Sequence, residues 1–182
     1  MKLSEILSQK KSDILERWLE AIVNSYHADT RRFLTRRKDQ FANPVGYELA
    51  ATTERLFQLV VDEKEISPEM VTPILDNIIR IRSIQDFSAS ESVSFVFLLK
   101  KAIRGELKEE ISANSLSGEL LEFETRIDDL ILIAFDIHMK CREKIYEIKA
   151  DMIKRDVSQL LKKSGLISEV PEWDEVRPDQ PE

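Results

Sequence analysis

The chain has few glycines, prolines and cysteines, the residues that interrupt helices and strands or cross-link a fold. Among its 182 residues are four glycines, six prolines and a single cysteine. So few turn-forming residues indicate a small number of long elements. One cysteine excludes an internal disulfide, and a reducing cytoplasm is the simpler location for such a chain.

Long apolar runs are also missing. The longest, Leu130–Phe135, is far too short to span a bilayer, and charged residues interrupt the first twenty positions. Apolar residues nevertheless make up 42% of the chain, enough for a packed core, and the length fits one domain. The sequence therefore predicts a soluble cytoplasmic protein without membrane insertion.

The net charge of −7 is concentrated at the C-terminal end. From Leu166 to Glu182 there are six acidic residues and one arginine, which leaves the preceding body close to neutral. An acidic tail on a nearly neutral body disfavours nucleic acid as the main partner.

Apolar spacing indicates helices throughout the chain. Residues 3–26 form an amphipathic pattern whose polar middle, 8–13, favours a kink. Asp29 is a candidate cap for a short helix that follows. No convincing strand pattern appears, so we expect an all-α fold, a helical bundle.

Three further helix starts carry recognisable capping chemistry. Asn43-Pro44 and Ser67-Pro68 each place a capping residue before proline at the first helical position. Ser88 and Glu91 have the spacing of a capping box, which predicts a helix from there to about residue 110.

The last helix is the unusual one, because no glycine or proline lies between Gly118 and Gly165. About 46 helical residues would extend about 69 Å, against a diameter of about 40 Å for a compact domain of this size. We therefore expect part of the helix to project from the body. Its second half narrows to one apolar stripe with heptad spacing, a candidate dimer helix. The stripe consists of His138, Cys141, Ile145, Ile148 and Met152.

These patterns divide the chain into three parts. Residues 1–137 form the helical core, 138–163 the heptad-like continuation of the last helix, and 164–182 the acidic tail. The tail has two interpretations, a disordered end or a linear docking motif. In the second, the anchors are Val170, Trp173 and Val176.

Residues that could support chemistry are sparse. His27 and His138 do not suit a haem ligand, and His138 with Cys141 supplies at most half of a metal site. A seam histidine and a small core cysteine are the plainer interpretation. We therefore predict no cofactor, no metal site and no catalytic residue.

Two polar clusters remain open to interpretation. The basic cluster, residues 31–38, suits a solvated face or a protein contact better than nucleic acid. The second is a candidate ligand or signal junction between two helices. It is either a structural bridge from arginine to aspartate or a small-anion site. It consists of Arg80, Arg82, Gln85 and Asp86.

Three blocks carry a resemblance to a known family. They are Arg17-Trp18, the block at 33–46 containing Phe-Ala-Asn-Pro-Val-Gly, and the block at 80–100 containing Ile-Gln-Asp-Phe-Ser. In order and spacing they resemble the N-terminal domain of RsbT co-antagonist proteins, the RsbR/RsbD group of bacterial stress-signalling regulators. The resemblance covers most of residues 1–160.

The resemblance implies a dimeric helical input domain, similar to a globin without haem. In such proteins the terminal helix leads into a STAS output domain that holds the RsbT kinase in a large cytoplasmic assembly, the stressosome. This chain departs from that pattern, because no STAS domain fits after Gly165. The output is therefore expected in a separate protein.

The leading hypothesis is a non-enzymatic signalling input or adaptor domain. It would transmit a ligand or partner signal through a dimeric terminal helix to a separate output protein. The alternative is an accessory subunit that docks its acidic tail on a larger redox or signalling complex. A hydrolase or lyase using Arg80, Arg82 and Asp86 is a third hypothesis and ranks behind both.

Overall fold

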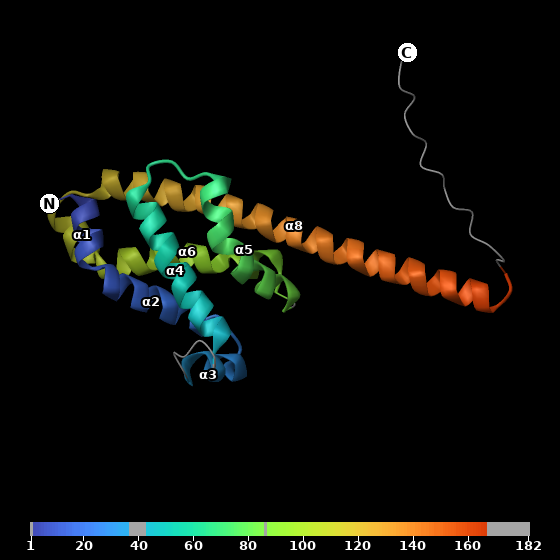
Figure 1. The fold of residues 1–182 in the computed structure, drawn as a ribbon. Helices are drawn as coiled ribbons and strands as arrows, with labels where there is room; N and C mark the ends of the chain where they lie inside the picture. The colour runs from blue at the N-terminus through green and yellow to red at the C-terminus, as the bar shows by residue number, and fades with distance from the viewer. Residues whose placement is uncertain (1, 37–42, 86, 167–182) are drawn as a thin grey trace, which may run out of the picture. The chain divides into compact units, whose positions relative to one another are not determined.

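A computed structural model describes residues 2–36, 43–85 and 87–166. Within these ranges the chain forms eight helices and no strand, so the all-α prediction is confirmed (Figure 1). The helices are α1 (Leu3–Gln9), α2 (Lys11–Asn24), α3 (Ala28–Arg36), α4 (Pro44–Asp62), α5 (Pro68–Ile84), α6 (Ala89–Glu106), α7 (Lys108–Ala113) and α8 (Ser117–Lys163).

The chain divides after Arg142 into two compact units. The first holds α1 to α7 and the N-terminal part of α8, and the second begins at Glu143 within the same helix. In the first unit α2 packs most extensively against α6, and α4 packs against α5. The largest fully buried side chains of its core are Trp18, Arg82, Phe57, Phe95 and Phe123.

The predicted helix starts at 44 and 89 have their expected capping bonds. The Asn43 carboxamide oxygen accepts from the Gly46 amide at 2.9 Å, while its nitrogen donates to the Leu34 carbonyl at 2.8 Å. At α6, the Ser88 amide donates to the Glu91 carboxylate at 2.9 Å and the Ser88 hydroxyl accepts from the Glu91 amide. Each cap satisfies amides that the first helical turn leaves without partners.

Gly46 is required by the cap that precedes it. A Cβ at this position would lie 2.3 Å from the Asn43 side-chain nitrogen, closer than any van der Waals contact permits. The glycine of the Asn-Pro-Val-Gly block therefore makes room for the buried asparagine that starts α4.

Two helix ends differ from the sequence-based expectation. The helix expected over 3–26 is two helices broken at Lys10, and the one expected to reach 110 ends at Glu106. Lys10 bridges the two breaks. Its ammonium group donates to the Glu106 carbonyl at 3.0 Å and pairs with the Glu110 carboxylate at 2.5 Å, which ties the α1–α2 break to the α6–α7 break. Asp29 lies inside the first turn of α3 instead of before it.

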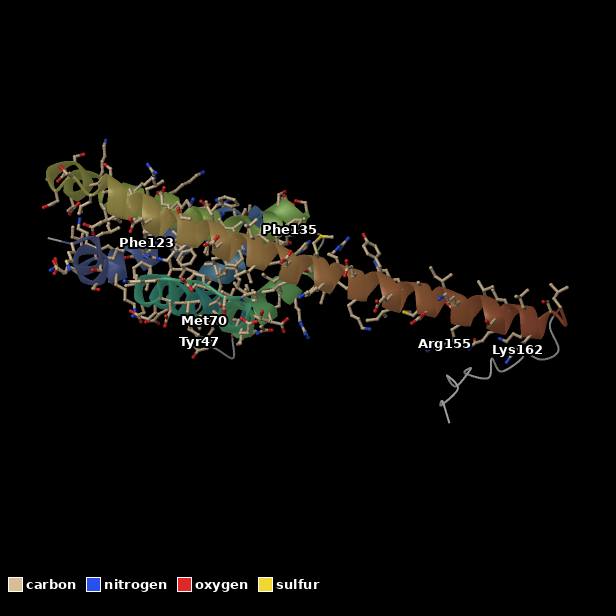
Figure 2. All side chains as sticks on the ribbon, turned by 90° about the horizontal axis from the view of Figure 1, so that it is seen from above. Tyr47, Met70, Phe123, Phe135, Arg155 and Lys162 are labelled. Carbon is tan, nitrogen blue, oxygen red and sulfur yellow. The ribbon has the colours of Figure 1, made fainter. Side chains whose placement is uncertain are left out.

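The burial of side chains on the long helix α8 changes along its 47 residues. In the first unit its inward side chains are buried, among them Phe123, and Glu124 accepts a paired hydrogen bond from Arg104 of α6. In the second unit every residue from Glu143 to Lys163 is exposed except the half-buried Ile145 and Leu161. Figure 2 shows side chains standing off the helix around Arg155 and Lys162. No described helix is both long and apolar enough to cross a membrane.

Candidate functional site at the junction of α5 and α6

Arg82, in the last turn of α5, is the largest charged side chain in the core, with 1% of its surface exposed. Its guanidinium carbon lies 4.7 Å from the ring centre of Phe87, 4.9 Å from Tyr26 and 5.3 Å from Phe95. Aromatic faces carry negative partial charge and attract a cation at these distances. Three rings from three parts of the chain therefore enclose one buried positive charge.

The hydrogen bonds of Arg82 are incomplete. One guanidinium nitrogen, Nη2, donates to the Glu91 carbonyl at 3.3 Å, while Nε and Nη1 have no acceptor among the described residues. The buried hydroxyl of Tyr26 lies near the guanidinium without reaching hydrogen-bond geometry. Burial lowers the pKa of Arg82 from its ordinary value, but arginine remains protonated in proteins. A charged group with unsatisfied hydrogen-bond donors is therefore buried inside the fold.

A cavity of about 460 Å³ lies next to this arginine. Arg82 does not line it, but Tyr26 and Phe87 both line the cavity and both contact the guanidinium. Its volume is in the range of small-molecule sites. The lining residues are Ser25, Tyr26, His27, Thr30, Gln85, Phe87 and Glu91.

The structure separates the residues of the predicted junction. Gln85 lines the cavity, whereas Arg82 does not line it but contacts the lining residues Tyr26 and Phe87. Arg80 is exposed and pairs with Asp76 one turn earlier on α5, at 3.0 Å. Asp86 lies outside the described residues, so the predicted bridge from arginine to Asp86 stays a prediction.

The residue after Arg82 connects the junction to α8. The Ser83 hydroxyl donates to the Ile79 carbonyl at 2.8 Å and lies 2.9 Å from Nδ1 of His138. The Ser83 carbonyl accepts from Arg142 at 3.3 Å. His138 is buried, with 2% exposed, and burial followed by the charge of Arg142 lowers its pKa. Ser83 thus binds two residues of α8, one turn apart.

This contact buries His138, the first residue of the predicted dimer stripe, within the first unit. His138 packs on α5, and Cys141 is half-buried, with a thiol pKa raised first by burial and then by Asp76. Among the described residues no group of three or more His, Cys, Asp or Glu side chains is arranged to hold a metal ion.

Residues 12–151 match the family described as the RsbT co-antagonist protein rsbRD N-terminal domain. The chain belongs to this family. The match runs from α2 through the α5–α6 junction and the Ser83 contact into the second unit of α8. Searches of curated proteins and of solved structures give no match.

The Arg17-Trp18 pair, one of the three blocks that carry the resemblance, has a clear structural role in this chain. The Trp18 indole donates to the Phe95 carbonyl of α6 at 2.7 Å, and Arg17 pairs with Glu106 at 2.5 Å. A Cβ at Gly105 would lie 2.7 Å from the Arg17 guanidinium, so the glycine lets that side chain cross α6.

The remaining sequence-based candidates of the rsbRD N-terminal domain lie away from the cavity or outside the described residues. Ile145, Ile148 and Met152 are in the second unit. Arg31 and Arg32 are exposed on α3, and Arg31 donates to the Asn24 and Tyr26 carbonyls. The rest of the basic cluster beyond Arg36, together with the tail anchors Val170, Trp173 and Val176, lies outside the described residues.

Sequence reasoning missed three participants of the site. Tyr26 lies near the end of α2, far in sequence from Arg82, and nothing in its neighbourhood marks it as a ring over a cation. Ser83 was part of a family block but had no assigned role. The sequence identifies Glu91 only as part of the capping box of α6, and the structure shows that it also lines the cavity.

Proposed function

We propose that this rsbRD N-terminal domain is a non-enzymatic, cytoplasmic signalling input domain that acts on a separate output protein. The family match over residues 12–151 is the observation that carries the proposal. The Ser83 contacts supply a physical route for it, because they join the α5–α6 junction to α8 through side chains that a local change would disturb.

In this proposal α8 carries the signal and pairs with the α8 of a second copy. The second unit supports pairing because its helix exposes many large apolar side chains, among them Tyr146, Ile148, Met152, Ile153, Val157 and Leu160. A helix with this much exposed apolar surface is stabilised when a partner covers it. The dimer stripe predicted from the sequence contributes only its last three members to this pairing. The whole stripe is His138, Cys141, Ile145, Ile148 and Met152.

Sedimentation velocity on the full chain at micromolar concentration tests the pairing. We expect twice the mass of the chain, with dissociation on dilution. A monomer throughout this range would contradict transmission through a dimeric helix.

The acidic tail supports the alternative, an accessory subunit that docks on a larger complex. Val170, Trp173 and Val176 are apolar anchors in acidic surroundings, the pattern of a linear docking motif. If the tail is the docking element, Trp173→Ala removes the partners that full-length protein captures, while dimerisation is retained. An unchanged partner set would exclude the tail as the contact.

A further inference from the structure

Two hydrogen-bond donors of Arg82, Nε and Nη1, have no acceptor among the described residues. A buried charged group is stabilised when its hydrogen bonds are made, and buried groups left unsatisfied are few in native proteins. The rings of Tyr26, Phe87 and Phe95 attract the cation through their faces, and the Tyr26 hydroxyl beside it does not reach hydrogen-bond geometry, so Nε and Nη1 are left without an acceptor. No described residue supplies that acceptor, and the adjacent cavity has room for one.

We propose that the cavity lined by Tyr26, Phe87 and Glu91 binds a small organic carboxylate whose charged end is bound by Arg82. The inference rests on the proposed input function and names the chemistry of its signal. A carboxylate fits because it is an acceptor-only anion, and a guanidinium binds carboxylates with short, charge-assisted hydrogen bonds.

The lining favours a single negative charge on an apolar or aromatic body. Tyr26 and Phe87 offer ring surface, and Ser25, Thr30 and Gln85 add neutral polar groups. Glu91 also lines the cavity. Its bonds to Ser88 lower its pKa and keep it ionised, so it repels any negative charge on a ligand that Arg82 does not neutralise. Dicarboxylates and phosphates are therefore disfavoured.

Phe87 controls access to the arginine. It lies between the end of α5 at Ile84 and the start of α6 at Ala89, outside both helices. Rotation of its ring would uncover the guanidinium without moving a helix. Any adjustment of Arg82 is passed to the next residue, Ser83, whose two oxygens contact His138 and Arg142 of α8.

Titration of the full chain with benzoate, with benzamide as the neutral analogue of the same shape, tests the site. Isothermal titration calorimetry gives the affinities, and the Nε–H resonance of Arg82 in a ¹H–¹⁵N spectrum reports on the donor itself. The matched variants are Arg82→Met and Arg80→Met, which remove the same charge from the same helix. Thr30→Trp fills the cavity from its exposed rim and leaves Arg82 intact.

We expect benzoate to bind at least about tenfold more tightly than benzamide, the effect of one charge-assisted hydrogen bond. Arg82→Met and Thr30→Trp should each abolish this preference, and Arg80→Met should keep it. If Arg82→Met fails to fold, the Thr30→Trp variant and the Arg82 resonance still decide the question.

Equal affinity for benzoate and benzamide would overturn the proposal. So would an unmoved Arg82 resonance at about 10 mM benzoate, where even a millimolar complex is nearly saturated. Sedimentation of the same samples separates this failure from that of the proposed function. A dimer that ignores benzoate contradicts only the ligand site, whereas a monomer contradicts the dimeric input domain whatever benzoate does.

Discussion

His138 donates from Nδ1 to the hydroxyl oxygen of Ser83 across 2.9 Å. The direction follows from proton counting, because Ser83 has one hydroxyl proton and donates it to the Ile79 carbonyl at 2.8 Å. The neutral imidazole is therefore the tautomer protonated on Nδ1. A second proton would place a full charge in a buried position beside Arg142.

The first prediction is a loss of stability as the pH falls below neutral. Burial, then Arg142, lowers the pKa of folded His138, whereas in the unfolded chain it titrates near its ordinary value of 6.5. From there down to the folded pKa the unfolded state binds more protons, so the free energy of unfolding decreases as pH decreases. Urea unfolding at pH 7.5, 6.5 and 5.5 measures this decrease in the free energy of unfolding. The titration of His138 contributes at most about 1.4 kcal/mol per pH unit.

His138→Asn provides the control, because it keeps a side-chain donor and removes the titration. We expect a shallower pH dependence in this variant. The carboxylates with lowered pKa, Glu69, Glu91 and Glu110, titrate below this window and leave the comparison intact. The same slope in wild type and variant would show that His138 does not titrate differently in the folded state.

Local signals made most of the fold predictable. The Asn43 cap and the Ser88–Glu91 box are short-range chemistry, and both were placed correctly from sequence. The contacts of Lys10 at the α1–α2 break are with Glu106 and Glu110, about 100 residues away, and no local pattern reveals them.

The candidate site was predictable only in part, for the same reason. Arg82 was identified, but its enclosure by Tyr26 and the bond from Ser83 to His138 are contacts between distant helices. Heptad spacing assigned His138 to a dimer seam because a stripe on a helix does not say which neighbour covers it.

The second prediction concerns the contact between α2 and α6. Trp18→Phe removes the buried hydrogen bond to the Phe95 carbonyl and leaves a cavity, since Trp18 is completely buried. We expect a loss of about 2–4 kcal/mol in the free energy of unfolding, measured by urea denaturation. Tyr47→Phe, which trims an exposed hydroxyl on α4, should change it by less than about 0.5 kcal/mol. Similar values for both would contradict the role of the indole.

The third prediction concerns the pair between α6 and α8. Arg104 donates from Nε and Nη2 to the two carboxylate oxygens of Glu124 at 2.6 and 2.7 Å, and Glu124 is buried. Arg104→Met leaves that carboxylate without its partner, and we expect a loss of about 1–2 kcal/mol, reduced by the exposure of the arginine. Arg80→Met breaks an exposed pair and should cost less than about 0.5 kcal/mol. Thermal unfolding of both variants at one pH compares them; equal effects would rule out a special role for Glu124.

The fourth prediction concerns the start of α4. Gly46→Ala forces the Asn43 side chain out of its bonds to Leu34 and Gly46, so we expect a loss of about 1–2 kcal/mol, the usual value of a helix cap. Gly118→Ala in the first turn of α8 has nothing within 4 Å and should leave stability unchanged or raise it. Circular dichroism during urea unfolding measures both. An unaffected Gly46→Ala variant would mean that Asn43 has another rotamer of equal energy.

The last prediction decides which face of the second unit pairs. Two apolar stripes compete on this helix. The sequence-based one continues through Ile145, Ile148 and Met152 but then meets Arg155 and Gln159. The other has five members at steps of four and three, a complete heptad pattern, and its four large side chains are exposed. Its members are Tyr146, Ala150, Ile153, Val157 and Leu160.

Because the second stripe stays apolar for longer, we expect Ile153→Glu to weaken dimerisation at least about tenfold through an unpaired buried charge. Ile148→Glu should weaken it less, and Ser158→Glu, which adds the same charge on a third face, should leave it unchanged. Sedimentation equilibrium measures the three dissociation constants. A larger effect of Ile148→Glu would instead support the sequence-based seam, because glutamate destabilises pairing most where the partner helix excludes water.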